Sequence, residues 1–344
     1  MTRKLLVWMY APGYPQWTMP EVSVAAIRES LGREWVVGSL RVPVFAAGDG
    51  AGAAPPELLT EMADVEVYIG FGVPREAFEV ARRLRWVHSG AAGVGAALFP
   101  AVRASGVVLT NSAGVHAEPL AEFAIAAMLH FGRGLDAAGR GKRARAWLHR
   151  EISAAEKKLF ELSGRTVGIV GYGAIGSAVG RRAAGLGMRV LALRRRWAEP
   201  PPPEVSEQFG REGVPRLLRA SDVVVLTLPE TPQTRGLIGV PELDAMREGA
   251  VLINVSRGGI VDEEALVAAL RAGRLRGAAL DVFRREPLPP ESPLWSLENV
   301  LITPHVAALS PRFWERETGL ILRNISRYLA GEPLENTVSK ELGY

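Results

Sequence analysis

The feature that most constrains this chain is a series of short apolar segments in its second half, separated by stretches of helical composition. The segments are nearly continuous runs of Val, Ile, Leu and Ala, which we interpret as strands at 166–170, 190–193, 222–228, 250–255, 278–282 and 300–303. Continuous apolar strands are typical of a parallel sheet that is covered on both faces. Their alternation with helical segments such as 175–186 and 263–272 predicts a doubly wound α/β fold.

The N-terminal third shows the same alternation less regularly. We expect strands there at 5–9, 65–69, 86–88 and 107–110, with a helix at 76–85. From Ala117 onward the pattern changes to the apolar stripe of a buried helix. Because 344 residues exceed what one core usually supports, two domains are expected.

Composition excludes several classes of site and partner. The chain has no cysteine, so disulfides, thiolate metal sites and cysteine nucleophiles are ruled out, and we expect no metal site. The 41 basic and 37 acidic residues are spread along the chain, whereas a nucleic-acid binder concentrates its basic excess in a patch. No apolar run approaches the ~20 residues of a membrane span. The first ten residues resemble a strand more than a signal peptide, so we expect a cytoplasmic protein with no nucleic-acid or membrane partner.

A glycine-rich turn follows the strand expected at 166–170. Gly171, Gly173 and Gly176 form a G-x-G-x-x-G pattern that opens a helix, with Ala174 and Ile175 between the last two glycines. In this context the first glycine makes the turn, the second admits a pyrophosphate, and the third lets helix and strand pack closely. The helix N-terminus then supplies N–H groups for the phosphates, which predicts a dinucleotide site.

The strand expected at 190–193 bears on which dinucleotide is bound. An acidic residue at its end would hold the ribose 2′-hydroxyl of NAD, but the residues there are Arg194, Arg195 and Arg196. A carboxylate repels a 2′-phosphate, whereas guanidinium groups bind one through charge-assisted hydrogen bonds. The chain uses arginine freely, which is the alternative explanation. The missing acid and the three arginines together favour NADP(H) over NAD(H).

Three further segments follow expected strands, at the edge where open α/β sheets place their ligands. They read Asn-Val-Ser-Arg-Gly-Gly-Ile-Val-Asp at 254–262, Leu-Asp-Val-Phe-Arg-Arg-Glu-Pro at 280–287 and Thr-Pro-His-Val-Ala at 303–307. With the glycine turn, they resemble the D-isomer-specific 2-hydroxyacid dehydrogenase family, which includes glyoxylate/hydroxypyruvate reductases. The resemblance implies a Rossmann coenzyme domain and a flavodoxin-like substrate domain, with the cleft between them.

This resemblance implies that Arg257, Glu286 and His305 are catalytic. Reduction of a 2-keto acid brings a hydride to the carbonyl carbon and a proton to the carbonyl oxygen, and an imidazolium can deliver that proton near neutral pH. Glu286, hydrogen-bonded to the far ring nitrogen of His305, would favour the charged ring. Arg257 would bind the substrate carboxylate and polarise the keto oxygen. Each residue alone has a structural alternative, but their shared order and spacing favour catalysis.

The resemblance also implies contacts around this centre. Ala92 and Gly93, in the loop at 89–94, would donate backbone N–H groups to the substrate carboxylate. Asp281 would hold the nicotinamide carboxamide, although it could instead cap the turn after its strand. The remaining positions would lie along the nicotinamide half of the coenzyme, and they are Leu228, Pro229, Thr234 and Val255.

Some residues depart from the family or lie outside its motifs. Gly95 stands where the family often has aspartate, and Ala113 where it often has proline, so the adjacent loops and the substrate preference can differ. A glutamate at 286 argues against the formate dehydrogenase branch, where a glutamine is usual. We expect a structural role for the other histidines, which are His88, His116, His130 and His149. Of these, His116 lies close to the expected cleft.

The resemblance sets the expected organisation of the chain. A substrate domain would comprise 1–112 and 306–344, and a coenzyme domain 113–305. The segment 132–158 resembles the family's dimerisation arm, so a homodimer is expected. Glyoxylate or hydroxypyruvate is the leading type of substrate, and bulkier 2-keto acids stay open. Two alternatives are a dinucleotide-sensing corepressor and a dehydrogenase of another small donor such as phosphite.

Overall fold

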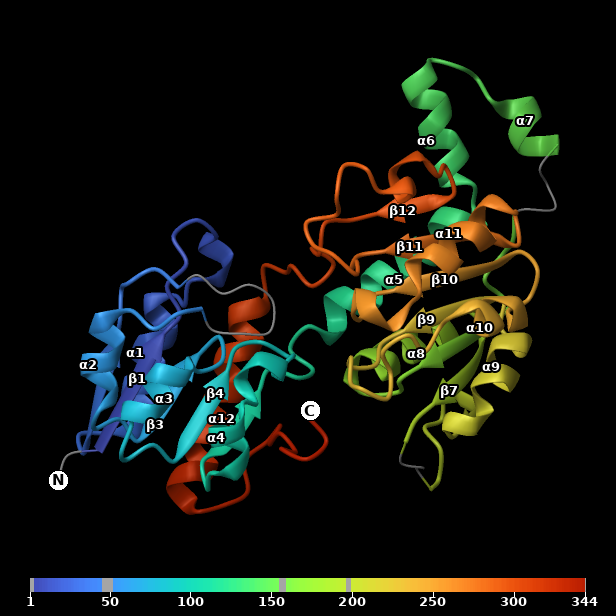
Figure 1. Ribbon diagram of the computed structural model, residues 1–344. Helices are drawn as coiled ribbons and strands as arrows, with labels where there is room; N and C mark the ends of the chain where they lie inside the picture. The colour runs from blue at the N-terminus through green and yellow to red at the C-terminus, as the bar shows by residue number, and fades with distance from the viewer. Residues whose placement is uncertain (1–2, 45–51, 155–158, 196–198, 344) are drawn as a thin grey trace. The chain divides into compact units, whose positions relative to one another are not determined.

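The computed structural model describes residues 3–44, 52–154, 159–195 and 199–343. The chain divides into two compact units (Figure 1). One comprises Met1–His116 with Ser310–Tyr344, and the other Ala117–Leu309. The chain therefore crosses between units after His116 and after Leu309, where the sequence predicted crossings after 112 and 305.

The first unit is built on a five-stranded parallel sheet with the order β2-β1-β3-β4-β5. This is the order of flavodoxin-like folds, as predicted. The strands are β1 (Arg3–Trp8), β2 (Trp35–Ser39), β3 (Val67–Gly70), β4 (Trp86–Ser89) and β5 (Val108–Asn111).

Helices cover both faces of this sheet, because successive side chains of each buried strand point to opposite faces. One face packs against α1 (Glu21–Leu31) and α12 (Phe313–Ala330), which bury residues such as Ile27 and Ile321. The other face packs against α2 (Pro56–Met62), α3 (Arg75–Val80) and α4 (Pro100–Ala104). Short 3₁₀ helices lie in the loops as η1 (Pro15–Trp17) and η2 (Gly95–Ala97).

The second unit contains a seven-stranded parallel sheet with the order β12-β11-β10-β9-β6-β7-β8. Read from β8, this is the Rossmann order with one strand added, and the direction of the connections reverses beside β6. The strands are β6 (Thr166–Val170), β7 (Arg189–Leu193), β8 (Val205–Phe209), β9 (Val223–Leu226), β10 (Ala250–Asn254), β11 (Leu275–Leu280) and β12 (Val300–Ile302).

Two apolar layers enclose this second sheet, each beneath a set of helices. One lies under α5 (Ala117–Gly132) and α8 (Ala174–Gly185), and the other under α9 (Val214–Ala220), α10 (Val240–Ala245) and α11 (Glu263–Arg271). The 3₁₀ helices of this unit are η4 (Arg211–Gly213), η5 (Gly258–Ile260) and η6 (Pro293–Ser296).

Two helices extend from the second unit as an arm, α6 (Leu135–Ala144) and α7 (His149–Ala154). A buried ion pair anchors its base, because the Arg276 guanidinium on β11 bonds both carboxylate oxygens of Asp136 at 2.8 and 2.9 Å. Arg276 also donates to the Phe131 carbonyl at the end of α5. The arm therefore leaves the core at a fixed point.

The predicted doubly wound α/β architecture is confirmed, but two strands were missed. β2 and β8 are edge strands whose side chains are largely half-buried or exposed; β8 has polar residues at its centre, whereas the short apolar run at the start of β2 was not interpreted as a strand. Within the described residues, no helix is long and apolar enough to cross a membrane.

Candidate active site

A close imidazole–carboxylate pair lies on the second unit, beyond the ends of β11 and β12. The Nδ1 atom of His305 is 2.7 Å from Oε2 of Glu286. The other carboxylate oxygen, Oε1, accepts a hydrogen bond from the Phe283 N–H at 2.9 Å. The His305 and Glu286 side chains are 41% and 35% exposed, so the pair is open to a small molecule.

The pair shifts the proton affinity of both partners. The hydrogen bond to Glu286 raises the pKa of His305 above its usual value, against the lowering effect of burial. Burial alone would raise the pKa of Glu286, but the hydrogen bonds from His305 and Phe283 leave it below its usual value. The arrangement therefore favours an imidazolium beside a carboxylate.

The backbone of His305 adopts an unusual conformation that Asp281 stabilises. His305 has φ = 55°, in the left-handed region that non-glycine residues rarely occupy. Its N–H donates to the Asp281 carbonyl at 2.9 Å. Oδ1 of Asp281 accepts from the Thr303 hydroxyl at 2.7 Å and from the N–H groups of Val306 and Ala307 at 2.9 and 3.1 Å. This buried carboxylate thus closes the turn that presents His305.

Arg257 belongs to the same centre. It follows β10 and precedes η5, in a turn that Asn254 stabilises by accepting from Ser256 and donating to the Arg257 carbonyl at 3.0 Å. A side chain at Gly258 would lie 1.9 Å from the Phe283 backbone, so the turn packs directly against the loop that carries Glu286. The charge of Arg257 lowers the pKa of both His305 and Glu286. The structure therefore brings the three expected catalytic residues together.

The glycine turn has the geometry expected of it. Gly171 has φ = 104°, where a side chain would also meet the Leu228 backbone at 2.7 Å. A Cβ on Gly176 would lie 2.5 Å from the Gly171 carbonyl oxygen. At Gly173 a Cβ would meet nothing within 4 Å, so the start of α8, with Ala174 and Ile175 in its first turn, faces open space. This space fits a phosphate group approaching the helix N-terminus.

Arg194 lies directly after β7, at the position where an acid would mark an NAD site. Its N–H donates to the Phe209 carbonyl at 3.0 Å, which fixes its backbone beside β8. Its side-chain Nε is buried and has no hydrogen-bond partner among the described residues. Arg195 is exposed, and Arg196 lies outside the described residues. The orphaned donor fits a site for an anionic group.

The loop expected to bind the substrate carboxylate lies on the first unit, after β4. The Asn111 side chain donates to the Ala92 carbonyl at 2.6 Å, and the Gly90 N–H donates to the Gly70 carbonyl at 2.8 Å. No group among the described residues accepts from the N–H of Ala92 or Gly93. Two consecutive backbone donors are thus available at this loop.

Comparison with known proteins agrees with this architecture. The sequence model of the family described as D-isomer specific 2-hydroxyacid dehydrogenase, NAD binding domain, matches residues 125–307. The glyoxylate reductase of Korarchaeum cryptofilum is 38% identical over 279 residues, which cover 78% of this chain and 80% of that protein. The chain belongs to the D-isomer-specific 2-hydroxyacid dehydrogenase family.

Solved structures of family members cover this chain completely. A D-isomer specific 2-hydroxyacid dehydrogenase from Xanthobacter autotrophicus Py2, in complex with NADPH and MES, is 30% identical with a TM-score of 0.78, and 100% of each chain is covered. An NADPH-dependent glyoxylate/hydroxypyruvate reductase from Sinorhizobium meliloti, in complex with NADP and sulfate, is 27% identical with a TM-score of 0.79 and the same coverage. The chain is therefore a 2-hydroxyacid dehydrogenase with an NAD(P)-binding domain, and neither alternative function is favoured.

The remaining expected coenzyme positions of this dehydrogenase line the ends of β9 and β10. Leu228 and Val255 are buried, and the Val255 N–H donates to the Leu226 carbonyl. The Thr234 hydroxyl donates to the Pro229 carbonyl at 2.7 Å and accepts from the Thr231 N–H at 2.8 Å. Thr234 thus closes the 229–234 turn, a role that the sequence did not reveal.

Asn254 and Thr303 are functional positions that the sequence motifs contain but did not single out. Both support turns that carry an expected catalytic residue, Asn254 at Arg257 and Thr303 at His305. An Asn at a strand end, two residues before Ser, is the local signal for the first of these turns. The second has no local signal, because Thr303 binds a carboxylate 22 residues away.

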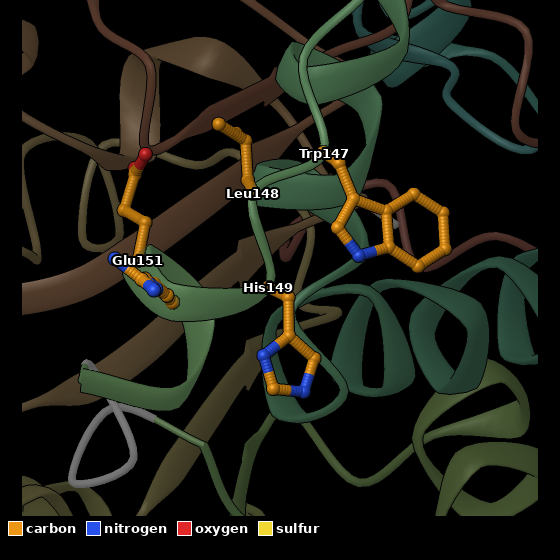
Figure 2. Close-up of a pocket in the computed structure, with 5 residues that line it drawn as sticks. Trp147, Leu148, His149 and Glu151 are labelled. Carbon is orange, nitrogen blue, oxygen red and sulfur yellow. The ribbon is translucent and has the colours of Figure 1, made fainter.

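A separate hollow lies on the arm, and none of the residues that line it belongs to the candidate site. Its walls are the consecutive residues Trp147, Leu148, His149, Arg150 and Glu151 (Figure 2). It contains no paired imidazole and carboxylate of the kind seen at His305. Trp147 is 93% exposed there, so an indole ring projects from the arm.

Proposed function

We propose that this dehydrogenase reduces a small 2-keto acid, such as glyoxylate or hydroxypyruvate, to the 2-hydroxy acid with NADPH. The observation that carries the proposal is the 2.7 Å contact between His305 and Glu286, with Arg257 next to it. The named relatives support the substrate class, because glyoxylate reductases and a glyoxylate/hydroxypyruvate reductase are among them.

His305 supplies the proton. Because Glu286 holds Nδ1, the Nε2 atom is the nitrogen that delivers a proton to the keto oxygen. The hydrogen bond to Glu286 raises the pKa of His305 and so favours the protonated ring that reduction requires. Glu286 also orients the ring, and Asp281 fixes the backbone that carries it.

Arg257 and the loop after β4 bind the acid. The guanidinium of Arg257 pairs with the substrate carboxylate and polarises the keto group as negative charge develops on its oxygen. The backbone N–H groups of Ala92 and Gly93 donate to the same carboxylate, since no described protein group accepts from them. A short polar acid satisfies these donors with few other contacts.

The coenzyme site is formed by the glycine turn and the residues after β7, β9, β10 and β11. When bound, the coenzyme supplies the hydride. The N-terminus of α8 binds the pyrophosphate, and Arg194 with its two neighbours binds a 2′-phosphate, which makes NADP(H) the favoured form. Asp281 accepts the nicotinamide amide through Oδ2, which has one hydrogen bond of its own, from Ala307 at 3.1 Å. The wall beside the nicotinamide half of the coenzyme is formed by Leu228, Pro229, Thr234 and Val255.

The protein forms a homodimer through the arm. Within 132–158, of which 155–158 lie outside the described residues, the arm presents an exposed indole at Trp147 and is anchored by Arg276 and Asp136. An exposed tryptophan on an anchored projection is typical of an interface residue. The cytoplasmic location and the lack of a nucleic-acid partner stay predictions.

The test is oxidation of NADPH and NADH, in parallel, with glyoxylate, hydroxypyruvate, pyruvate and bulkier 2-keto acids. We expect turnover with NADPH to exceed that with NADH and to be lost in His305→Gln. Arg194→Ser should raise the KM for NADPH about tenfold and leave that for NADH within twofold, because only the first carries a 2′-phosphate.

The outcomes separate the parts of the proposal. Turnover that favours NADH would contradict the coenzyme preference and leave the reaction in place. Tight dinucleotide binding without turnover of any acid would contradict the reaction itself.

A further inference from the structure

We propose that a buried network of Ser112, Glu317 and His88 positions the loop at 89–94 for the substrate carboxylate. The inference rests on the proposed function of that loop and adds residues that no motif of the sequence pointed to. All three are positioning residues, since they would act on substrate only through the loop.

The network joins three elements of the first unit inside its core. The Glu317 carboxylate, on α12, has Oε1 3.0 Å from His88 Nε2 on β4 and 2.9 Å from Ser112 Oγ, directly after β5. The side chains of His88 and Glu317 and the whole of Ser112 are 0% exposed. A set of polar groups this buried and this close is fixed by its own hydrogen bonds.

The far side of the imidazole is fixed as well. His88 Nδ1 is 2.9 Å from the Thr110 hydroxyl, which also accepts from the Trp86 indole N–H at 2.9 Å. His88 is therefore bound at both ring nitrogens, and its side chain has a single orientation. The position of Glu317 follows from that of His88.

Ser112 connects this network to the loop. Its hydroxyl is 2.9 Å from the Ser89 carbonyl, where the loop leaves β4, as well as from Glu317. Since one hydroxyl has one proton, the Ser89 carbonyl and the carboxylate compete for it, and its position depends on both. The Ser112 N–H also donates to the Ala91 carbonyl at 3.3 Å.

These bonds turn the loop carbonyls inward. The carbonyls of Ser89 and Ala91 accept from Ser112, directly after β5, and that of Ala92 accepts from Asn111, the last residue of β5. With the carbonyls held on that side, the Ala92 and Gly93 N–H groups are left without a protein acceptor among the described residues. The network thus fixes the carbonyls of Ser89 and Ala91, and Asn111 fixes that of Ala92, in the loop whose donors bind the carboxylate.

The space beside the loop at Gly90 is filled by Met9 and Glu317. A Cβ at Gly90 would lie 3.5 Å from Glu317 Oε1 and 2.3 Å from the Met9 side chain. The backbone at Gly90 therefore has no free space beneath it.

Stability alone is a weak reason for this arrangement. Glu317 Oε2 is buried with no hydrogen-bond partner among the described residues, and a buried polar pair that is replaced as a whole by apolar side chains of similar volume often loses no stability. A role in fixing the loop explains a carboxylate here better than a role in holding the core together.

The main test compares two buried serines. Ser112→Ala removes a hydroxyl that bonds the loop, and Ser221→Ala removes a fully buried hydroxyl that bonds the Leu217 carbonyl at 2.7 Å in the other unit. With glyoxylate and NADPH, we expect Ser112→Ala to raise the KM for glyoxylate about tenfold while kcat and the KM for NADPH stay within threefold. Ser221→Ala should leave all three constants within twofold.

Hydrogen exchange supplies a readout that needs no turnover. The Gly90 amide, bonded to the Gly70 carbonyl, should exchange at least fivefold faster in Ser112→Ala than in the wild type and be unchanged in Ser221→Ala. Glu317→Leu should raise the KM for glyoxylate like Ser112→Ala, whereas Glu317→Gln, which keeps an acceptor for His88 and Ser112, should stay within threefold of the wild type.

An unchanged Gly90 exchange rate in Ser112→Ala would overturn the inference, whether or not the wild type turns over a 2-keto acid. Faster exchange with an unchanged KM for glyoxylate would overturn it as well, as would an equal rise in KM in Ser221→Ala. A wild type that turns over no 2-keto acid counts against the proposed function alone, and the exchange rates then decide the inference.

Discussion

The described residues include two imidazole–carboxylate pairs, one in each unit, which differ chiefly in exposure. His305 and Glu286 are 2.7 Å apart with side chains 41% and 35% exposed, whereas His88 and Glu317 are 3.0 Å apart and fully buried. Only the first pair leaves a ring nitrogen for a ligand, because both nitrogens of His88 are bonded to protein groups. The two proposals thus assign proton transfer to the pair that solvent reaches, and backbone positioning to the pair that is buried.

The largest expected difference between the pairs is in turnover. His305→Gln removes the proton donor and should lower kcat about 10³-fold, within the usual range for a lost general acid. The matched variant His88→Gln should change kcat less than threefold, since that ring never meets the substrate. Steady-state kinetics with NADPH and glyoxylate measures both, and circular dichroism verifies that each variant is folded. Equal losses of kcat in the two variants would remove the distinction.

The second difference is in stability, where we expect breaking the buried pair to have the larger effect. Glu317→Leu leaves the buried His88 without its partner and should lower the free energy of unfolding by about 3 kcal/mol. Glu286→Leu breaks a half-exposed pair and should change it by less than about 1 kcal/mol. Urea unfolding followed by tryptophan fluorescence gives both values. A larger loss in Glu286→Leu would show that the exposed pair, and not the buried one, carries the stability.

The third difference is in pH dependence. The His305 pKa is raised, and reduction needs the protonated ring, so kcat/KM should be constant at low pH and fall as pH rises through that raised pKa. Glu286→Gln removes the carboxylate charge that raises the pKa, so the fall should begin at lower pH and kcat should drop about tenfold.

The matched variant is Glu317→Gln, which should leave the profile in place. Profiles between about pH 5 and 10, in one buffer system of constant ionic strength, test this. A fall that stays at the same pH in Glu286→Gln would mean that another group titrates.

The smallest expected effect is that of salt. Ions screen an exposed pair more than a buried one, so raising NaCl from 0.1 to about 1 M should move the falling limb of the wild-type profile by a few tenths of a pH unit toward lower pH. The unfolding free-energy difference between the wild type and Glu317→Leu should change by less than about 0.5 kcal/mol over the same range. A salt effect of equal size on both would indicate that water reaches the buried pair.

Much of the fold was predictable because local sequence patterns carry it. Seven-stranded and five-stranded parallel sheets bury both faces, so most of their strands are continuous apolar runs, as at Val223–Leu226. β8 was missed because it lies at an edge and carries polar residues, such as Ser206 and Glu207, and β2 was missed although it begins with a short apolar run. The ends of the predicted strands lie within three residues of the observed ends.

The sequence motifs named the residues that meet at the candidate site, but not the hydrogen bonds that hold their turns in place. The motifs at 254–262, 280–287 and 303–307 named Arg257, Glu286 and His305, which the structure brings together. The motifs did not show that Asp281 closes the His305 turn, that Thr234 bonds the Pro229 carbonyl, or that His305 occupies the left-handed region.

The sequence by itself determined the doubly wound α/β fold, the glycine turn and the three residues of the exposed centre. These depend on strand periodicity, backbone sterics at glycine and short motifs, all of which act over a few neighbouring residues. The tertiary structure alone decided that His88 meets Glu317, 229 positions away, and that Ser112 joins them to the loop after β4. Such contacts depend on how α12 packs against the five-stranded sheet, because burial, and not any local pattern, selects which polar groups must pair.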